Sequence, residues 1–82
     1  MKELILTIAK SLVDKPDEVV LNEVVLDEVQ GEETTIYELH VAKVDLGKVI
    51  GNQGVTAQAI RILMNATAAK LKKRAILEII EG

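Results

Sequence analysis

The spacing of apolar residues in the first half of the chain predicts a helix followed by a hairpin. In residues 2–14 apolar side chains recur at helical spacing among Lys and Glu residues, and Pro16 disfavours helical geometry at the residue before it. Residues 19–29 are rich in Val and Leu, which suits a strand, and residues 34–42 alternate in hydrophobicity. The polar segment between them predicts the turn of an antiparallel hairpin at Gln30-Gly31-Glu32-Glu33.

The second half of the chain predicts two helices and a final strand. Residues 44–50 favour a short helical segment that ends at Gly51, and a longer helix begins near Gly54 and continues to about Lys72. Residues 74–81 are rich in β-branched side chains, as strands are. The predicted order is helix, strand, strand, helix, helix, strand, with no internal repeat and no linker. We therefore expect one α+β domain over residues 1–82.

Composition limits the chemistry that this domain can perform. Its 82 residues leave room for one hydrophobic core, which must be aliphatic because Tyr37 is the sole aromatic residue. The absence of Cys excludes disulfides and thiolate metal sites. With His40 as its one histidine and Ser11 as its one serine, the chain has no nucleophile–base pair and no zinc site. We expect no catalytic residues, no metal, no cofactor and no enzymatic activity.

The N-terminal residues lack the apolar stretch and the small-residue cleavage site of a secretory signal. The sequence also has no run of about 18 apolar residues that could cross a membrane. We therefore expect a cytoplasmic protein that does not enter the membrane.

The net charge of −3 is unevenly distributed along the chain. Residues 1–42 carry three basic and ten acidic side chains, which is a net −7. Residues 43–74 carry seven basic side chains against one acidic residue, Asp45, which is a net +6. Such segregation suggests a polyanionic partner, although charge alone is equally compatible with two solvated halves.

Two glycines three residues apart, Gly51 and Gly54, separate the two predicted helices. By themselves they are also typical of a helix C-cap followed by an irregular helix start. Their surroundings favour a binding loop, because Val49-Ile50 lead into it and Ala57 and Ile60 follow at the spacing of a packed helix. Glycines allow a phosphodiester to approach closely, and amides at the start of the second helix attract its phosphates.

Two cations accompany this loop. Lys48 lies just before the loop, and Arg61 shares a flank of the longer helix with Gln58. If each neutralised one phosphate of a single strand, log K would fall with log salt concentration with a slope of about −1.4. Because aromatic side chains for stacking are nearly absent, we expect weak, modestly selective binding. The bases would lie in an aliphatic groove near Ile50 and Ala57, walled by the second strand and the Glu32-Glu33 turn.

The longer helix also has a second apolar face. On a helical wheel centred on Ile60, the predicted core face contains Thr56, Ala57, Leu63, Met64, Thr67, Ala68 and Leu71. The opposite face carries Val55, Ile62, Ala66 and Ala69. An exposed Ile beside small alanines suits the close approach of another helix, so these four residues predict an interface. The alternative is an isolated exposed Ile62.

A stretch around the glycines resembles the signature of the small single-KH proteins of the KhpA (YlqC) family: Asp45-Leu46-Gly47-Lys48-Val49-Ile50-Gly51-Asn52-Gln53-Gly54-Val55-Thr56-Ala57-Gln58-Ala59-Ile60-Arg61. Residues 8–17 are similar to that family too, so the resemblance covers essentially the whole chain. It implies a type II KH domain, whose αββααβ order matches the predicted one and whose three-stranded sheet is backed by three helices. One departure is the neutral pair Asn52 and Gln53, at loop positions that are often partly basic.

The resemblance also implies single-stranded RNA as ligand, bound beside the glycine loop. It implies pairing as a homodimer or as a heterodimer with a second KH protein of the KhpB, Jag or EloR kind. Such proteins are linked to post-transcriptional control, as regulators or RNA chaperones, and to cell elongation and division. The expected RNA-binding residues are Lys48, Val49, Ile50, Gly51, Asn52, Gln53, Gly54, Ala57, Gln58 and Arg61. The alternatives are a KH-shaped protein-interaction module and a binder of single-stranded DNA.

Overall fold

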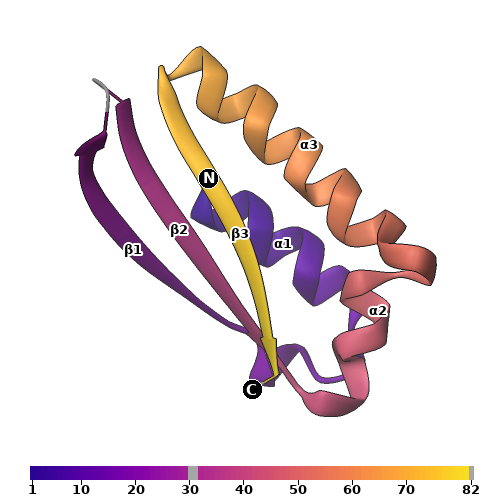
Figure 1. Cartoon of the computed structure of the whole chain (residues 1–82). Coiled ribbons are helices and arrows are strands. Elements are labelled where there is room, and N and C mark those ends of the chain that lie inside the picture. Colours follow the sequence, from indigo (N-terminus) through magenta and orange to yellow (C-terminus); the bar gives the residue numbers. More distant parts are fainter. Residues whose placement is uncertain (30–31, 82) are drawn as a thin grey trace.

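A computed structural model describes residues 1–29 and 32–81 and has the expected order αββααβ (Figure 1). Three short 3-10 turns join the main elements, at Pro16–Glu18, Lys43–Asp45 and Asn52–Gly54. The helices and strands are α1 (Lys2–Leu12), β1 (Val20–Val29), β2 (Glu32–Val41), α2 (Leu46–Ile50), α3 (Val55–Lys70) and β3 (Lys73–Glu81). Of the predicted hairpin turn, Gln30 and Gly31 lie outside the described residues, and strand β2 already begins at Glu32.

The three strands form one mixed sheet in the order β1-β2-β3. The central strand β2 pairs antiparallel with β1, where Leu21 faces Leu39, and parallel with β3, where Tyr37 faces Leu77. The parallel pair needs a long connection, which α2 and α3 provide. Helices α1 and α3 lie on the same side of the sheet (Figure 1). The fold is the type II KH arrangement that the resemblance implied.

The core lies between this sheet and the helices, and it is aliphatic as expected. The strands contribute alternating side chains from one face of the sheet, and the helices contribute residues at helical spacing. Tyr37 is buried within it at 8% exposure. The buried cluster consists of Ile5, Ala9, Val19, Leu21, Tyr37, Leu39, Val41, Val49, Ile60, Met64 and Leu77.

Two expectations about the helices need correction. Helix α1 ends at Leu12, two residues earlier than predicted, because the amides of Asp14 and Lys15 donate to the Asp45 carboxylate instead of to helical carbonyls. Leu63 of α3 and Leu71, which directly follows α3, are exposed rather than in the core. Helix α3 packs on the sheet along one narrow stripe, which consists of Ala57, Ile60, Met64 and Ala68.

Within residues 1–29 and 32–81, no helix is both long and apolar enough to span a membrane.

Candidate nucleic-acid interface

The two-glycine loop connects α2 and α3 at the surface. Helix α2 ends at Ile50, Gly51 follows at φ +78° and ψ 173°, and the 3-10 turn Asn52–Gly54 leads into α3. Gln53 and Gly54 both have positive φ, at +55° and +77°. Asn52 and Gln53 are exposed, so neutral amide side chains form the tip of the loop.

Gly51 is required by the fold itself. A Cβ atom built on Gly51 would lie 2.2 Å from Oγ1 of Thr56 and 2.7 Å from the backbone N of Thr56. The missing side chain is therefore replaced by the protein's own Thr56, and not by open space. Gly51 lets α2 and the start of α3 approach each other at a sharp angle.

Gly54 has the opposite environment. A Cβ atom built there would meet no heavy atom within 4 Å, although φ is +77°. Its missing side chain thus leaves an open surface directly before Val55, the first residue of α3. Two backbone amides of the turn are already used internally, since Gly54 N–H donates to the Gly51 carbonyl at 3.2 Å and Val55 N–H donates to the Asn52 carbonyl.

The structure separates the predicted RNA-binding residues into two groups. Ile50, Gln58 and the loop tip are exposed around the glycines. Val49 and Ala57 are buried, at 0% and 3% exposure, so they support the loop from the core and cannot line a surface groove. The helical wheel already places Ala57 on the core face of the longer helix, whereas the burial of Val49 follows from the packing of α2 against its neighbours.

Arg61 links α3 to the edge strand. Its Nη2 donates to the backbone carbonyl of Leu77 in β3 at 3.4 Å. The expected groove wall must also be corrected, because β2 is the central strand and β3 is the strand that packs beside α3. Beside the loop itself, a shallow depression is lined by the loop and the start of α3 alone, with Gly54, Gln58 and Arg61 among its residues.

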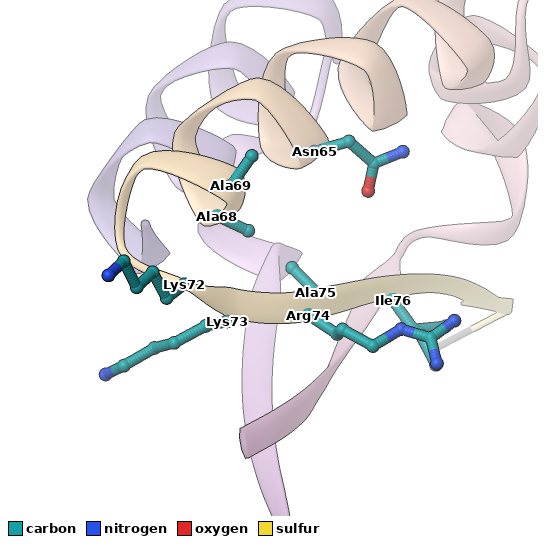
Figure 2. Close-up of a pocket in the computed structure, with 8 residues that line it drawn as sticks. All are labelled: Asn65, Ala68, Ala69, Lys72, Lys73, Arg74, Ala75 and Ile76. Atoms are coloured by element: carbon teal, nitrogen blue, oxygen red, sulfur yellow. The ribbon is translucent and has the colours of Figure 1, made fainter. Parts of the chain in front are cut away.

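A hollow lies between the C-terminal half of α3 and the start of β3 (Figure 2). Ala68, Ala69 and Ala75 are small enough to leave space between helix and strand, and basic side chains extend from its edge (Figure 2). Among the described residues, no acidic side chain lines it. Sequence reasoning missed this site, although the alanines beside a run of basic residues are a signal for it. Its full lining is Asn65, Ala68, Ala69, Lys72, Lys73, Arg74, Ala75 and Ile76.

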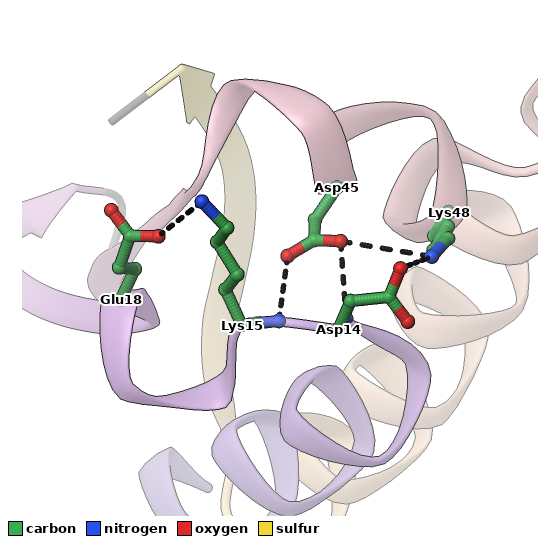
Figure 3. A network of polar contacts seen from close by, with 5 residues as sticks. All are labelled: Asp14, Lys15, Glu18, Asp45 and Lys48. Atoms are coloured by element: carbon green, nitrogen blue, oxygen red, sulfur yellow. Dashed lines mark hydrogen bonds and ion pairs between the residues drawn. The ribbon is translucent and has the colours of Figure 1, made fainter.

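Lys48 lies in a network of charges at the start of α2 (Figure 3). Its ammonium group donates to Oδ2 of Asp14 and lies 3.8 Å from Oδ1 of Asp45. Asp45 is 1% exposed and accepts the amides of Asp14 and Lys15, each at 3.0 Å. The hydrogen bond to Asp14 raises the pKa of Lys48 above its usual value, despite opposing desolvation.

The Asp45 carboxyl is ionised at neutral pH. Its pKa is lowered chiefly by the hydrogen bond from the Asp14 amide, with the Lys15 amide and the Lys48 ammonium acting in the same direction against desolvation. At neutral pH a buried negative charge therefore lies 3.8 Å from the Lys48 ammonium group.

The element order, the mixed sheet and the two-glycine loop between α2 and α3 define the class as a type II KH domain. Residues 2–79 match a family model described as the KH domain of KhpA/KhpB. The RNA-binding protein KhpA of Caldanaerobacter subterraneus subsp. tengcongensis is 56% identical over 98% of this chain and 100% of that relative. The proteins of the same name from Clostridium acetobutylicum and Borreliella burgdorferi are 55% and 52% identical, over 98% and 96% of this chain and 100% and 90% of the relatives.

The chain belongs to the KhpA/KhpB family of KH-domain proteins. Its relatives are named as RNA-binding proteins and not as enzymes, which confirms the expectation of a non-enzymatic protein.

The three glycines of this region predict different effects of substitution by alanine. Gly51→Ala should destabilise the fold by about 3 kcal/mol or more, because strain at its φ and ψ adds to overlap with Thr56. Gly54→Ala should cost only about 1–2 kcal/mol, since it has space but a left-handed φ. Gly47→Ala, inside α2 with nothing within 4 Å, serves as control and should stabilise by about 0.5–1 kcal/mol. Urea unfolding followed by circular dichroism measures all three, and equal costs at Gly51 and Gly54 would contradict these assignments.

Proposed function

We propose that the chain binds single-stranded RNA at the loop between α2 and α3. The proposal rests on Gly54, which has a positive φ and open space where a side chain would stand, directly before a 16-residue helix. A phosphate can approach such a surface closely, and the positive end of the helix dipole adds to the attraction. KH domains grip RNA with a GXXG loop of this kind, and the relatives are named for RNA binding.

From the loop, the RNA strand continues along α3 to the hollow between α3 and β3. Helix α3 is about 24 Å long, so the loop and the hollow contact different nucleotides. Lys72 and Arg74 offer cations to phosphates at this second position, and Ile76 offers an exposed aliphatic surface to a base. The proposed contacts nearer the loop are Lys48, Ile50, Gln58 and Arg61.

Binding of this kind is weak and only modestly selective. Stacking of bases on aromatic side chains contributes about 1–3 kcal/mol per base in other proteins. Tyr37, the sole aromatic residue, is buried and cannot stack on a base. Phosphate contacts and aliphatic surface therefore supply the affinity.

We further propose that the protein acts as a pair, through the exposed face of α3. Val55 and Ile62 are 65% and 59% exposed, and Ala66 is exposed beside them. Ala69 borders this face but also lines the hollow. The partner is a second copy or a related KH domain, which agrees with a family model that covers both KhpA and KhpB. Two linked weak sites bind one RNA far more tightly than either site alone.

The role that follows is that of a post-transcriptional regulator or RNA chaperone. Such a protein acts where its RNA ligands are, in the cytoplasm. A module that recruits only a protein, and a binder of single-stranded DNA, are the competing functions that the first experiment distinguishes.

The RNA function predicts that an acidic loop binds poorly. Asn52→Asp/Gln53→Asp should weaken binding of a single-stranded oligoribonucleotide about tenfold or more, because two negative charges then face the phosphates. Thr7→Asp/Asn22→Asp introduces the same charge on α1 and β1 and is the matched control. Fluorescence anisotropy with RNA and with DNA of the same sequence measures both. Equal binding by the two variants contradicts the loop mechanism, stronger binding of DNA points to the DNA function, and no binding of either points to a protein partner.

The hollow predicts a reduced salt dependence when its cations are removed. Lys72→Gln/Arg74→Gln should reduce the slope of log K against log salt concentration by about 1.4, as expected for the loss of two phosphate contacts. Lys2→Gln/Lys10→Gln removes the same charge from exposed positions of α1 and should leave the slope nearly unchanged. A slope that falls equally in both variants would mean that only the total charge matters.

The pairing proposal predicts that Ile62→Asp yields a monomer, because a charge would be buried between two α3 helices. Val44→Asp is the control, since Val44 is 69% exposed away from that face. Sedimentation of both variants and the parent should give dimers for the parent and Val44→Asp only. An unchanged dimer in Ile62→Asp rules this face out.

A further inference from the structure

Lys48 lies three residues before Gly51, yet its ammonium group is already paired with carboxylates of the protein. It donates to Asp14 and lies 3.8 Å from Asp45 (Figure 3). Asp14 belongs to the segment after α1, so this cation is held by a residue far away in the sequence. An arriving phosphate must compete with both carboxylates for it.

The two carboxylates differ in their roles. Asp45 is buried and holds the chain after α1 through two backbone amides, so it is part of the fold. Asp14 has a side chain that is 76% exposed and has Lys48 as its partner. The hydrogen bond to Asp45 fixes the backbone amide of Asp14. The Asp14 carboxylate therefore stays next to Lys48 with little further loss of conformational entropy.

We propose that Asp14 is an affinity-determining residue that restrains Lys48 and thereby lowers the RNA affinity of the glycine loop. This inference rests on the function proposed above. Removal of the Asp14 charge leaves the backbone hydrogen bonds to the Asp45 carboxylate intact. It also lets the Lys48 side chain, which is 43% exposed, turn toward a phosphate. Asp14 thus weakens binding although it contacts no RNA.

The test compares Asp14→Asn with Asp17→Asn. Both variants lose one negative charge from the same segment, and Asp17 has no ion pair within 4 Å among the described residues. Asp14→Asn should bind a single-stranded oligoribonucleotide more tightly than Asp17→Asn by up to about fivefold, the upper factor for one surface ion pair. Its slope of log K against log salt concentration should be steeper by up to about 0.7, because Lys48 then neutralises a phosphate in a larger fraction of the complexes.

Lys48→Gln supplies the decisive background. There, Asp14→Asn and Asp17→Asn should bind RNA equally, because no ammonium group is left to release. Thermal unfolding by circular dichroism verifies that each variant is folded. A purely structural role of Asp14 would change the unfolding temperature without steepening the salt dependence.

Two results overturn the inference. One is equal affinity of Asp14→Asn and Asp17→Asn in the parent background, and the other is a gain that persists in Lys48→Gln. If the parent binds RNA and Asn52→Asp/Gln53→Asp does not, the proposed RNA function holds. Either of the two results then disproves only the role of Asp14. If the parent fails to bind RNA, the proposed function and this inference are both wrong.

Discussion

The carboxylate of Asp45 accepts the backbone amides of Asp14 and Lys15, and the position of the loop depends on these two hydrogen bonds. They end helix α1 and join the chain after α1 to the start of α2. They also provide the buried Asp45 carboxylate with hydrogen-bond donors. A buried carboxylate is tolerated only with such partners. Because α2 is a helix of five residues, its anchorage at Asp45 also fixes its other end, where Gly51 begins the loop.

A second constraint lies at the C-terminal end of α2, where the two glycines of the loop have different roles. Gly51 is a requirement of packing, since Thr56 occupies the place of its side chain. Gly54 has no such neighbour and is free to meet a ligand. Loss of RNA binding on substitution of Gly51 would therefore reflect damage to the fold. Loss of RNA binding on substitution of Gly54 would reflect a change in the binding surface. The case for a phosphate clamp rests on Gly54 and the exposed tip, Asn52 and Gln53.

The local pattern of the sequence was sufficient for the order of elements, the aliphatic core and the position of the loop, because each depends on residues close together in the chain. It was insufficient wherever the partner is distant. No residue close to Asp45 in the sequence indicates that its hydrogen-bond donors are backbone amides 30 and 31 residues away. Likewise, the pairing of β2 with β3 makes β2 central, and this displaced the expected groove wall. The burial of Val49, an expected RNA-binding residue, follows from the same long-range packing, whereas the burial of Ala57 agrees with the core face that the helical wheel predicts.

The same distinction applies to charge. The basic segment of the chain suggested a polyanionic partner, but several of its cations are paired with carboxylates from other parts of the fold. The pairs are Lys43 with Glu81, Lys48 with Asp14 and Lys73 with Glu33. The effective attraction for a polyanion is therefore smaller than a net charge of the segment implies. For a domain with one open glycine, several paired cations and a buried tyrosine, the proposed RNA binding is expected to be weak. The proposed pairing through α3 would let two such domains bind one RNA more tightly than either domain alone.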